Sequence, residues 1–453
     1  MKRKIKILSL VLCCFLLCFS VAGCSLQDLF GGGYKSAYQV AVDNGYTGTE
    51  EEWLNTFRNG ERGLSAYDIA VQNGFVGTEV EWLESLTTND ESVTNATNLS
   101  MRSSVKVVAS KTVGDKIKLS NGAGTIISYN SSTHVAHILT CYHVIVDTTN
   151  SPKYCHNNVG IYFYGAESDS HFAHAATFLG GAIWADVAFL KVSIDEETWN
   201  KYHLKVASFN VNEPILGNKV IAIGNSNGKN LNAVVANISK QVEESAVANI
   251  DGTEGKTHLR VQRVNALLAH GNSGGGLFDT NAKLVGMVNA KSSDEEELNF
   301  SYAIPSSTIV AIYENITNQI SGSTTWAMAN KYKLGLDLTI IDMYTDIDEK
   351  GYLYPRDTVV IESASVPLGT LDISHDTLQS VTIKRGGSTY KSANINNVYT
   401  LGEMMWYVKA GDTVVIRYKD VSADVYKDIE IVPISTISNA EWYSTYSVDL
   451  TKC

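Results

Sequence analysis

The chain has 453 residues, of which 44% are hydrophobic and 19% are charged, and its formal net charge is −12. Such a length predicts two to four domains, because domains commonly contain about 100–200 residues. The ordinary balance of apolar and charged residues excludes a wholly disordered chain, a collagen and a multi-span membrane protein. The acidic charge argues against binding to nucleic acid through bulk electrostatics, so we expect no nucleic-acid partner.

The first 23 residues have the layout of a secretory signal peptide. Basic residues precede an apolar run from Ile7 to Ala22, which at about 16 residues is short for a membrane-spanning helix. Residues 21–24 (VAGC) resemble a bacterial lipobox, a signal in which the chain is cut before the cysteine and that cysteine receives a diacylglyceryl anchor. The resemblance implies a signal peptide over residues 1–23, a lipid anchor at Cys24 and an extracytoplasmic location on the bacterial membrane. An ordinary secretory signal or a short membrane anchor is the alternative.

Residues 24–35 carry the anchor and a glycine-rich spacer, and residues 36–86 hold two copies of a repeat with a period of 29 residues. Each copy predicts two short helices. The residues that delimit these helices recur in both copies: Ser36 and Ser65 as caps, Gly45 and Gly74 as terminators, and Thr49 with Glu52 and Thr78 with Glu81 as capping boxes. The pattern resembles a repeat in surface and phage-tail proteins of Gram-positive bacteria. It is either a helical stalk or a module that binds the envelope.

Two β-rich regions follow. Residues 87–104 are polar and lack hydrophobic periodicity, which predicts a linker. From residue 105 to about residue 315, short β-branched runs alternate with turns, as is typical of an antiparallel barrel or sandwich. A second β-rich segment covers residues 326–435.

Three local motifs in the first β-rich region occur in the order His, Asp, Ser. His143 follows an apolar run, Asp186 precedes another, and Ser273 lies in the sequence HGNSGG at residues 270–275. A serine hydroxyl becomes a strong nucleophile when an imidazole removes its proton, and a buried carboxylate holds that imidazole in the required tautomer. The glycines allow the N–H groups of Gly271 and Ser273 to face a developing oxyanion. Each motif alone has an ordinary structural explanation. Their order and spacing together predict a chymotrypsin-like double β-barrel peptidase.

Residues 105–315 resemble the protease domain of the HtrA/Deg family of trypsin-like serine proteases. The family motifs appear at residues 140–144 (TCYHV), 186–192 (DVAFLKV), 221–225 (IAIGN), 271–275 (GNSGG) and 302–305 (YAIP). The resemblance implies that His143 is the general base, Asp186 orients it, Ser273 is the nucleophile, and Gly271 contributes to the oxyanion hole. Two departures, Ala269-His270 before the motif and Gly276 after it, predict a looser oxyanion loop.

Residues 326–435 resemble the PDZ domain that follows HtrA proteases. Leu334, Gly335 and Leu336 correspond to the loop that binds the terminal carboxylate of a peptide, and residues 410–412 (AGD) correspond to the family's Pro-Gly-Asp. The resemblance therefore implies a fold of three parts: a small helical repeat region, a mainly β double-barrel protease domain and a PDZ-like domain. It also implies a C-terminal peptide as a partner of the last region.

The primary specificity pocket is predicted at Leu267 and Leu268. In chymotrypsin-like proteases the base of this pocket lies six residues before the nucleophile, which is Leu267 here, followed by Leu268. A branched apolar side chain offers no partner for a buried cation. We therefore expect cleavage after small or medium aliphatic residues and not after Lys or Arg.

No metal or cofactor is predicted. The histidine pairs His134/His137 and His171/His174 have metal-like spacing, but residues three apart in a strand point to opposite faces. Residues 294–297 (DEEE) are interpreted as a solvated loop. A disulfide between Cys141 and Cys155 is left open beside the alternative of buried free thiols, and Cys453 is the third cysteine outside the leader.

The sequence thus predicts an envelope serine endopeptidase that acts on misfolded or specific extracytoplasmic proteins. The alternative is a catalytically weak or inactive protease-like scaffold that binds proteins at the cell surface. HtrA proteases commonly assemble as homotrimers, but the residues do not decide the oligomeric state of this chain.

Overall fold

The computed structural model describes residues 37–59 except residue 44, a few residues between 65 and 79, and most of residues 89–436. The gaps in the last range are 114, 148–153, 156–157, 167–172, 249–255, 292–299 and 434. The chain divides into two compact units, residues 1–87 and 88–453, and each is described by itself. The predicted signal peptide, Cys24 and the spacer lie outside the described residues. Within the described residues, no helix has the length and apolar character needed to cross a membrane.

The first predicted repeat forms two helices, α3 (Ala37–Asp43) and α4 (Glu50–Asn59). Gly45 follows α3 with a φ of +95°, the left-handed conformation in which glycine commonly ends a helix. At the start of α4 the Glu52 N–H donates to Thr49 Oγ1 at 3.2 Å, and the Thr49 N–H donates to the Glu52 carboxylate at 2.7 Å. These two bonds confirm the predicted capping box.

The second repeat is described only in part, but one tertiary contact recurs in both copies. The Tyr38 hydroxyl donates to Gly48 O at 2.8 Å, and the Tyr67 hydroxyl donates to Gly77 O at 2.7 Å. Ser65 Oγ accepts a hydrogen bond from the N–H three residues later at 3.0 Å, as a helix cap does. The sequence repeat therefore corresponds to a repeated structural unit.

Most of the predicted linker is a helix, so this prediction is wrong over α7 (Asn89–Met101). Ala96 and Ser100 are buried at 2% and 1% exposure, and Ala96 belongs to the core of the second unit. The helix escaped sequence analysis because its two fully buried residues, Ala96 and Ser100, are small, and only Val93 and Met101 add larger apolar side chains against the core. Small residues produce no apolar stripe with helical spacing.

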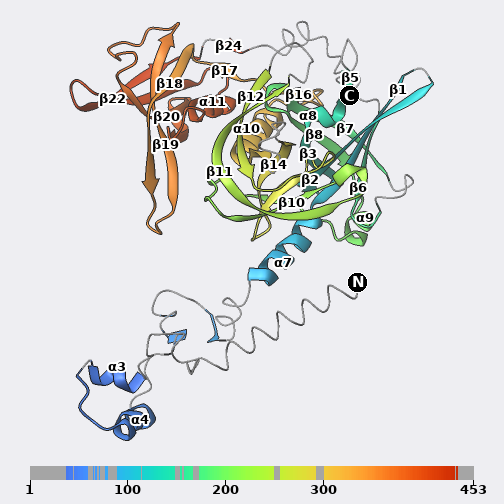
Figure 1. Ribbon diagram of the computed structural model, residues 1–453. Coiled ribbons are helices and arrows are strands. Elements are labelled where there is room, and N and C mark those ends of the chain that lie inside the picture. The colour runs from blue at the N-terminus through green and yellow to red at the C-terminus, as the bar shows by residue number, and fades with distance from the viewer. Residues whose placement is uncertain are drawn as a thin grey trace, which may run out of the picture. The chain divides into compact units, whose positions relative to one another are not determined.

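The first barrel is a closed antiparallel sheet in the strand order β7-β6-β1-β2-β3-β8, in which β8 pairs back onto β7 (Figure 1). Its strands are β1 (Ser104–Val113), β2 (Lys116–Asn130), β3 (Val135–Cys141), β6 (Asn158–Phe163), β7 (His174–Ala182) and β8 (Val187–Ser193). The shorter elements of this barrel are α8 (Tyr142–Ile145), β4 (Val146–Asp147), β5 (Tyr154–Cys155), the 3₁₀ helix η2 (Ile183–Ala185) and α9 (Glu196–Lys201).

The second barrel closes in the same way, in the order β13-β10-β11-β12-β15-β14, with β14 pairing back onto β13. Its strands are β10 (Lys219–Gly224), β11 (Asn232–Ala248), β12 (Lys256–Val264), β13 (Gly276–Asp279), β14 (Lys283–Lys291) and β15 (Ser301–Pro305), with β9 (Ser208–Phe209) added at the edge of β14 and the 3₁₀ turn η3 (Ser226–Gly228) after β10. The two closed six-stranded barrels confirm the predicted double-barrel fold class.

Alternation of side chains explains why these runs form barrel walls. In β3, Ala136 and Ile138 are fully buried, whereas their neighbours Val135 and His137 are partly exposed. Successive side chains of a strand point to opposite faces, so this pattern places one face inside the barrel. Where β8 is covered on both sides, Val187 to Leu190 are all buried.

A helix and a third β-rich region complete the second unit. The elements after the second barrel are α10 (Ser306–Thr317), β16 (Ala327–Met328), β17 (Tyr332–Lys333), β18 (Leu336–Ile347), β19 (Leu353–Ala364), β20 (Thr377–Arg385), β21 (Ser388–Asn394), α11 (Thr400–Met404), η5 (Met405–Tyr407), β22 (Thr413–Asp420), β23 (Val425–Ile431) and β24 (Ser435–Thr436). Strands β21-β20-β22-β23 form one sheet, and β18–β19 and β17–β24 form two-stranded ribbons.

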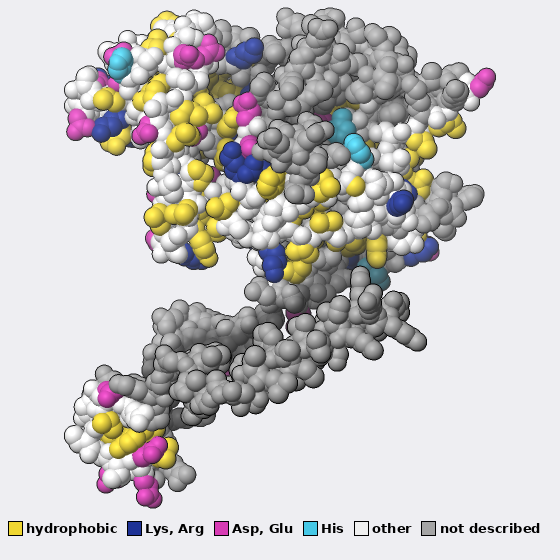
Figure 2. All heavy atoms as spheres, in the orientation of Figure 1, with side chains coloured by type: hydrophobic (Ala, Val, Ile, Leu, Met, Phe, Trp, Pro, Cys, Tyr) yellow, Lys and Arg dark blue, Asp and Glu magenta, His cyan; other side chains and the backbone are white. Residues whose placement is uncertain are grey.

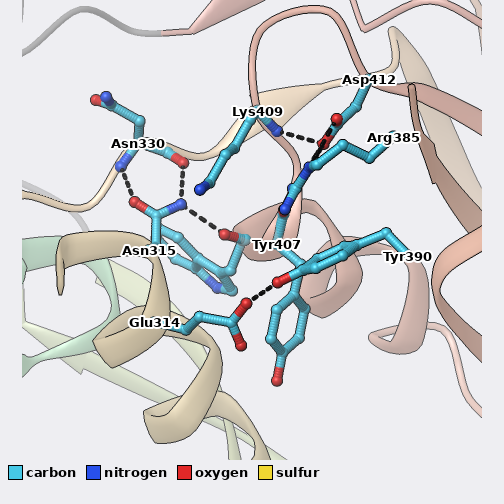
Figure 3. A network of polar contacts seen from close by, with 9 residues as sticks. Glu314, Asn315, Asn330, Arg385, Tyr390, Tyr407, Lys409 and Asp412 are labelled. Carbon is cyan, nitrogen blue, oxygen red and sulfur yellow. Dashed lines mark hydrogen bonds and ion pairs between the residues drawn. The ribbon is translucent and has the colours of Figure 1, made fainter. Parts of the chain in front are cut away.

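Helix α10 joins the second barrel to the C-terminal region through one buried amide. Asn315 Nδ2 donates to Asn330 O at 2.9 Å and to Trp406 O at 2.5 Å, and Asn315 Oδ1 accepts from the Asn330 N–H at 2.9 Å. Figure 3 shows this network beside the contact between Tyr390 and Glu314. One side chain therefore binds the connecting segment and η5 to α10.

The β18–β19 ribbon carries an unusual number of exposed apolar side chains. Ile341, Met343, Tyr344 and Ile347 are 52–74% exposed, and Figure 2 shows apolar side chains gathered along this ribbon. The ribbon contacts the second barrel through an ion pair of 2.7 Å between Arg356 and Glu213.

Candidate active site

His143 and Asp186 come together because of the register of two neighbouring strands. The last residue of β3, Cys141, pairs with the first residue of β8, Val187. His143 follows that pair in α8, and Asp186 precedes it in a left-handed conformation (φ 53°, ψ 36°) that aspartate tolerates better than most residues. The ends of adjacent antiparallel strands thus present both side chains at one rim of the first barrel.

The two side chains are joined by hydrogen bonds. His143 Nδ1 lies 2.6 Å from Asp186 Oδ2, and the His143 backbone N–H donates to Asp186 Oδ1 at 2.9 Å. Asp186 is 3% exposed, whereas the side chain of His143 is 36% exposed. This arrangement fixes a proton on Nδ1 and leaves Nε2 of the ring as the basic nitrogen.

The same contact adjusts the basicity of the imidazole. Burial lowers the pKa of His143, whereas the charge of Asp186 and its hydrogen bond raise this pKa. The two favourable contacts together outweigh burial, so the pKa of His143 lies above its ordinary value. A raised pKa makes the ring a stronger base, because it stabilises the imidazolium that forms when a proton is accepted.

Ser273 reaches this rim from the second barrel. Its carbonyl accepts a hydrogen bond from the Ala123 N–H of β2 at 2.9 Å, which ties the loop before β13 to the first barrel. Gly274 has a φ of +85°, and a Cβ there would lie 2.3 Å from Ala123 O, so only glycine fits. Ser273 Oγ donates to Asn289 O at 3.1 Å. Within the described residues no hydrogen bond joins this hydroxyl to His143.

The loop before Ser273 has free backbone donors. The N–H groups of Gly271 and Ser273 donate no hydrogen bond within the part of the chain that the structure describes. Two free N–H groups that can converge on one oxygen are the requirement for an oxyanion hole. His270 is exposed, as an ordinary loop histidine would be.

Asn289 is a site residue that sequence analysis missed. Its side-chain Nδ2 donates to Asp186 Oδ2, and its backbone carbonyl is the acceptor for Ser273 Oγ. It is 3% exposed, and its Oδ1 is buried without a partner among the described residues. The only signal in the sequence is a polar residue at the end of the apolar run in β14.

Cys141 lies behind the same carboxylate. The Cys141 thiol donates to Val288 O at 3.3 Å, and the side chain is fully buried. Cys141 is a free cysteine, so it forms no disulfide with Cys155. Cys141, His143 and Asp186 each have one atom that could ligate a metal ion, and these three atoms lie within 4.8 Å of one another. Burial and the nearby charge of Asp186 raise the pKa of the thiol well above its usual value, however. The thiol is therefore held in its protonated form beside the carboxylate.

The two leucines of the predicted specificity pocket have different environments. Leu267 is 58% exposed, whereas Leu268 is 4% exposed and belongs to the core of the second barrel. The Leu268 N–H donates to Ser301 Oγ at 3.0 Å, which holds it in that core. Of the two, Leu267 is therefore the residue available to contact a substrate.

Comparison with known proteins agrees with this geometry. The family model described as trypsin-like peptidase domain matches residues 122–287. This range includes His143, Asp186 and Ser273. This part of the chain is therefore similar to trypsin-like peptidase domains. The serine protease Do-like HtrA of Bacillus subtilis (strain 168) is 29% identical over 234 residues, which are 50% of this chain and 46% of that protein. The related HtrB of the same organism is 24% identical over 196 residues, 42% of this chain and 37% of its own length.

A serine protease HtrA-like of Staphylococcus aureus (strain bovine RF122 / ET3-1) is 25% identical over 195 residues, 43% of this chain and 23% of that protein. The chain thus spans about half or less of the length of these relatives. Among solved structures, the HtrA-type protease AlgW with a tripeptide has a TM-score of 0.49 at 15% identity, covering 76% of this chain and 97% of that chain. The Rv3671c protease from M. tuberculosis has a TM-score of 0.38 at 21% identity, covering 48% and 82%.

A second candidate site lies in the C-terminal region. Leu334, Gly335 and Leu336 connect β17 to β18 and line a cavity of about 590 Å³. The opposite wall includes Leu401 and Met405 of α11 and η5. The edge of β18 that does not face β19 is free of strand partners among the described residues. The lining also includes Ser363 and Ala364 of β19, so the cavity lies against both strands of the ribbon. A cavity next to an unpaired strand edge is a candidate site for an extended peptide.

The other predicted residues lie apart from both sites. His134 Nδ1 lies 3.3 Å from the Tyr129 hydroxyl, and His137 Nδ1 lies 2.6 Å from the Tyr313 hydroxyl, so the two histidines contact different tyrosines. His171 and residues 294–297 lie outside the described residues.

Proposed function

We propose that the protein is an envelope serine endopeptidase that hydrolyses peptide bonds with His143, Asp186 and Ser273. The observation that carries the proposal is the pair His143–Asp186, joined at 2.6 Å and connected through Asn289 to Ser273, whose loop has two free N–H groups. The trypsin-like peptidase profile over the same residues and the HtrA relatives support it. Misfolded or specific extracytoplasmic proteins are the proposed substrates.

The chemistry follows from the positions of the groups. Ser273 Oγ leaves the Asn289 carbonyl, passes its proton to His143 Nε2 and attacks the scissile carbonyl carbon. Asp186 stays ionised and stabilises the imidazolium. The N–H groups of Gly271 and Ser273 stabilise the oxyanion of the tetrahedral intermediate. The protonated imidazole then donates its proton to the leaving amine as the C–N bond breaks, which leaves the acyl group on Ser273 Oγ. His143 next takes a proton from a water molecule that attacks this ester, and returns the proton to Ser273 Oγ as the acid product leaves.

The peptidase is proposed to cleave after small or medium aliphatic residues. Leu267 carries this proposal, because its exposed apolar side chain offers no charge to a Lys or Arg side chain of the substrate. Mass spectrometry of casein fragments tests it. Cleavage predominantly after Lys or Arg would overturn it.

The C-terminal region is proposed to be a PDZ-like domain that binds the C-terminal segment of a peptide. The cavity between β18 and α11 supports strand addition, with the N–H groups near Leu334, Gly335 and Leu336 facing the terminal carboxylate. A purified full-length protein with Ser273 replaced by Ala should bind peptides of a C-terminal library. The absence of binding to any member would remove this function.

Lipid anchoring at Cys24 is the proposed link to the membrane, with the repeats of residues 36–86 between the anchor and the peptidase. A homotrimer is the assembly that the HtrA relationship suggests. Radioactive palmitate should label the wild type and not the Cys24→Ala variant. Label that persists in the variant would overturn the assignment.

Two measurements test the proposed reaction against the alternative of an inactive scaffold. The wild type should digest casein and react with a fluorophosphonate probe at Ser273, whereas Ser273→Ala should do neither while keeping its circular dichroism. The variant Asp186→Asn should keep residual activity, lowered by about four orders of magnitude. A folded wild type that neither labels nor digests casein would favour the scaffold. Normal turnover by Ser273→Ala would refute the triad.

A further inference from the structure

The turn after β10 holds the backbone of the oxyanion loop. The Asn227 N–H donates to His270 O at 2.6 Å, and the Asn225 N–H donates to Gly271 O at 3.2 Å. The carbonyl groups of His270 and Gly271, which flank the Gly271 N–H along the chain, therefore both point at this turn. The sequence predicts a loose loop here, because Ala269, His270 and Gly276 depart from the family pattern. The turn supplies contacts that compensate for those departures.

The planarity of the peptide bond converts these contacts into an orientation. In a trans peptide the C=O and the following N–H point in opposite directions within one plane. Because Asn227 holds His270 O, the N–H of Gly271 must point away from the turn. The same N–H has no acceptor within the described part of the chain, so it is available to a developing oxyanion.

Side chains anchor the turn on three sides. Asn225 is fully buried, and its Nδ2 donates to Gly122 O of β2 at 3.2 Å. The Ser226 hydroxyl lies 3.0 Å from the side-chain amides of both Asn232 on β11 and Asn272 in the oxyanion loop. The turn is thus connected to the first barrel, to the wall of the second barrel and to the residue next to Ser273.

The local backbone leaves little room for another arrangement. Gly271 has a φ of +92°, and a Cβ at this position would lie 2.2 Å from Asn225 O. Asn227 adopts the left-handed conformation (φ 54°, ψ 24°), which asparagine and glycine accept and β-branched residues do not. Loop and turn are therefore in contact at the level of the main chain.

We propose that Asn225, Ser226 and Asn227 are positioning residues that orient the Gly271 N–H for oxyanion stabilisation. The inference rests on the proposed peptidase function. None of the three residues is assigned a contact with substrate or with the reacting atoms. Their effect belongs to the transition state, where the oxyanion forms, and not to ground-state binding.

Two pairs of variants in the full-length protein test the proposal. Ser226→Ala removes the hydroxyl and Ser226→Thr keeps it; Asn227→Val opposes the left-handed conformation and Asn227→Gly permits it. With a chromogenic aliphatic peptide as substrate, Ser226→Ala and Asn227→Val should each lower kcat by roughly tenfold or more. This loss should be smaller than the 10²–10³-fold loss in kcat that follows deletion of an oxyanion-hole donor. KM should stay within about twofold of the wild type. Ser226→Thr and Asn227→Gly should restore most of kcat.

A second readout separates positioning from general stability and from failure of the proposed reaction. Binding of a peptide aldehyde, whose adduct has an oxyanion, should weaken in parallel with kcat, while thermal unfolding remains cooperative. Crystal structures of Ser226→Ala and the wild type should differ in the distance from Asn227 N to His270 O. If the wild type is inactive but the distance from Asn227 N to His270 O changes in Ser226→Ala, the result supports the positioning of the loop by the turn and refutes the proposed peptidase reaction. If an active enzyme keeps its kcat and aldehyde affinity in Ser226→Ala and Asn227→Val, the positioning inference is refuted.

Discussion

At the scale of single residues, Asp186 is the centre of the site. It accepts hydrogen bonds from the His143 backbone, from the His143 ring and from Asn289, and it lies beside the buried thiol of Cys141. Each hydrogen-bond donor offsets part of the cost of removing a carboxylate's charge from water. The ionised form is the one that the proposed mechanism needs.

The pH dependence of activity follows from the His143–Asp186 contact. His143 must be neutral to accept the serine proton, and its pKa is raised by the charge and hydrogen bond of Asp186 after burial has lowered it. We expect kcat/KM to fall as the pH decreases through an apparent pKa above the ordinary imidazole value of about 6.5. A pH–rate profile checks this, and Asp186→Asn should move the acidic limb to lower pH. An acidic limb well below pH 6.5 in the wild type would contradict the expectation.

Asn289 provides a second prediction at this scale. Asn289→Ala removes one donor to Asp186, and Asn289→Asp places a second carboxylate against it. Two carboxylates in contact resist being ionised together, so one takes up a proton. We expect Asn289→Asp to lose more kcat at pH 7 than Asn289→Ala, and to show an altered pH–rate profile. Equal losses, or a loss in KM alone, would argue against a role of the amide in orienting Asp186.

At the scale of elements, α7 illustrates how a helix can dock without an apolar stripe. The Ser104 hydroxyl donates to Ser100 O at 2.9 Å, and Ala96 is buried in the core of the second unit. Close approach of a helix backbone is favoured by small residues on the contact side. This explains why a polar segment is part of the folded second unit.

The docking of α7 predicts a contrast between neighbouring positions. Ala96→Asp places a charge in the core and should lower the free energy of unfolding by several kcal/mol, because the carboxylate loses its hydration. Asn95→Asp, one residue away on the exposed side, should change it by less than about 0.5 kcal/mol. Urea denaturation of the full chain measures both. Similar stabilities of the two variants would show that α7 does not pack in solution.

At the scale of the second unit, buried and partly buried polar contacts join the C-terminal region to the second barrel and to α10. Arg260 of β12 forms an ion pair with Glu403 of α11, and the Thr308 hydroxyl of α10 donates to the same carboxylate at 2.5 Å. Asn315 adds the amide network of Figure 3. Breaking a buried polar contact on one side leaves the other group unsatisfied, which costs more than the bond itself contributes.

Asn315 is the member of this interface with a clear prediction. Asn315→Ala removes the acceptor of the Asn330 N–H and the donor to Trp406 O, at a cost of about 1–3 kcal/mol. Amide hydrogen exchange at Asn330 should therefore accelerate, and limited proteolysis should cut between α10 and β17 more rapidly. Asn318→Ala, at the exposed C-terminal end of the same helix, is the matched control and should leave both unchanged. Unaltered exchange at Asn330 in Asn315→Ala would contradict the role of this amide.

Local patterns in the sequence predict most of the secondary structure and the three residues of the proposed triad. Strand alternation, capping boxes and the glycine-rich motif around Ser273 depend on neighbours within a few residues, and the structure has them where the patterns place them. The order and spacing of the motifs predict that His143 and Asp186 act together. The register of β3 with β8 brings the two side chains into contact.

The remaining features depend on contacts between distant parts of the chain. Asn289 is 103 residues from its partner Asp186, and Ser226 is 46 residues from Asn272. A single polar residue beside an apolar run has the same local pattern whether it faces solvent or a buried carboxylate, so its role appears only when both barrels are closed. The same reason applies to α7, whose small residues acquire a buried side only from the surface on which they pack.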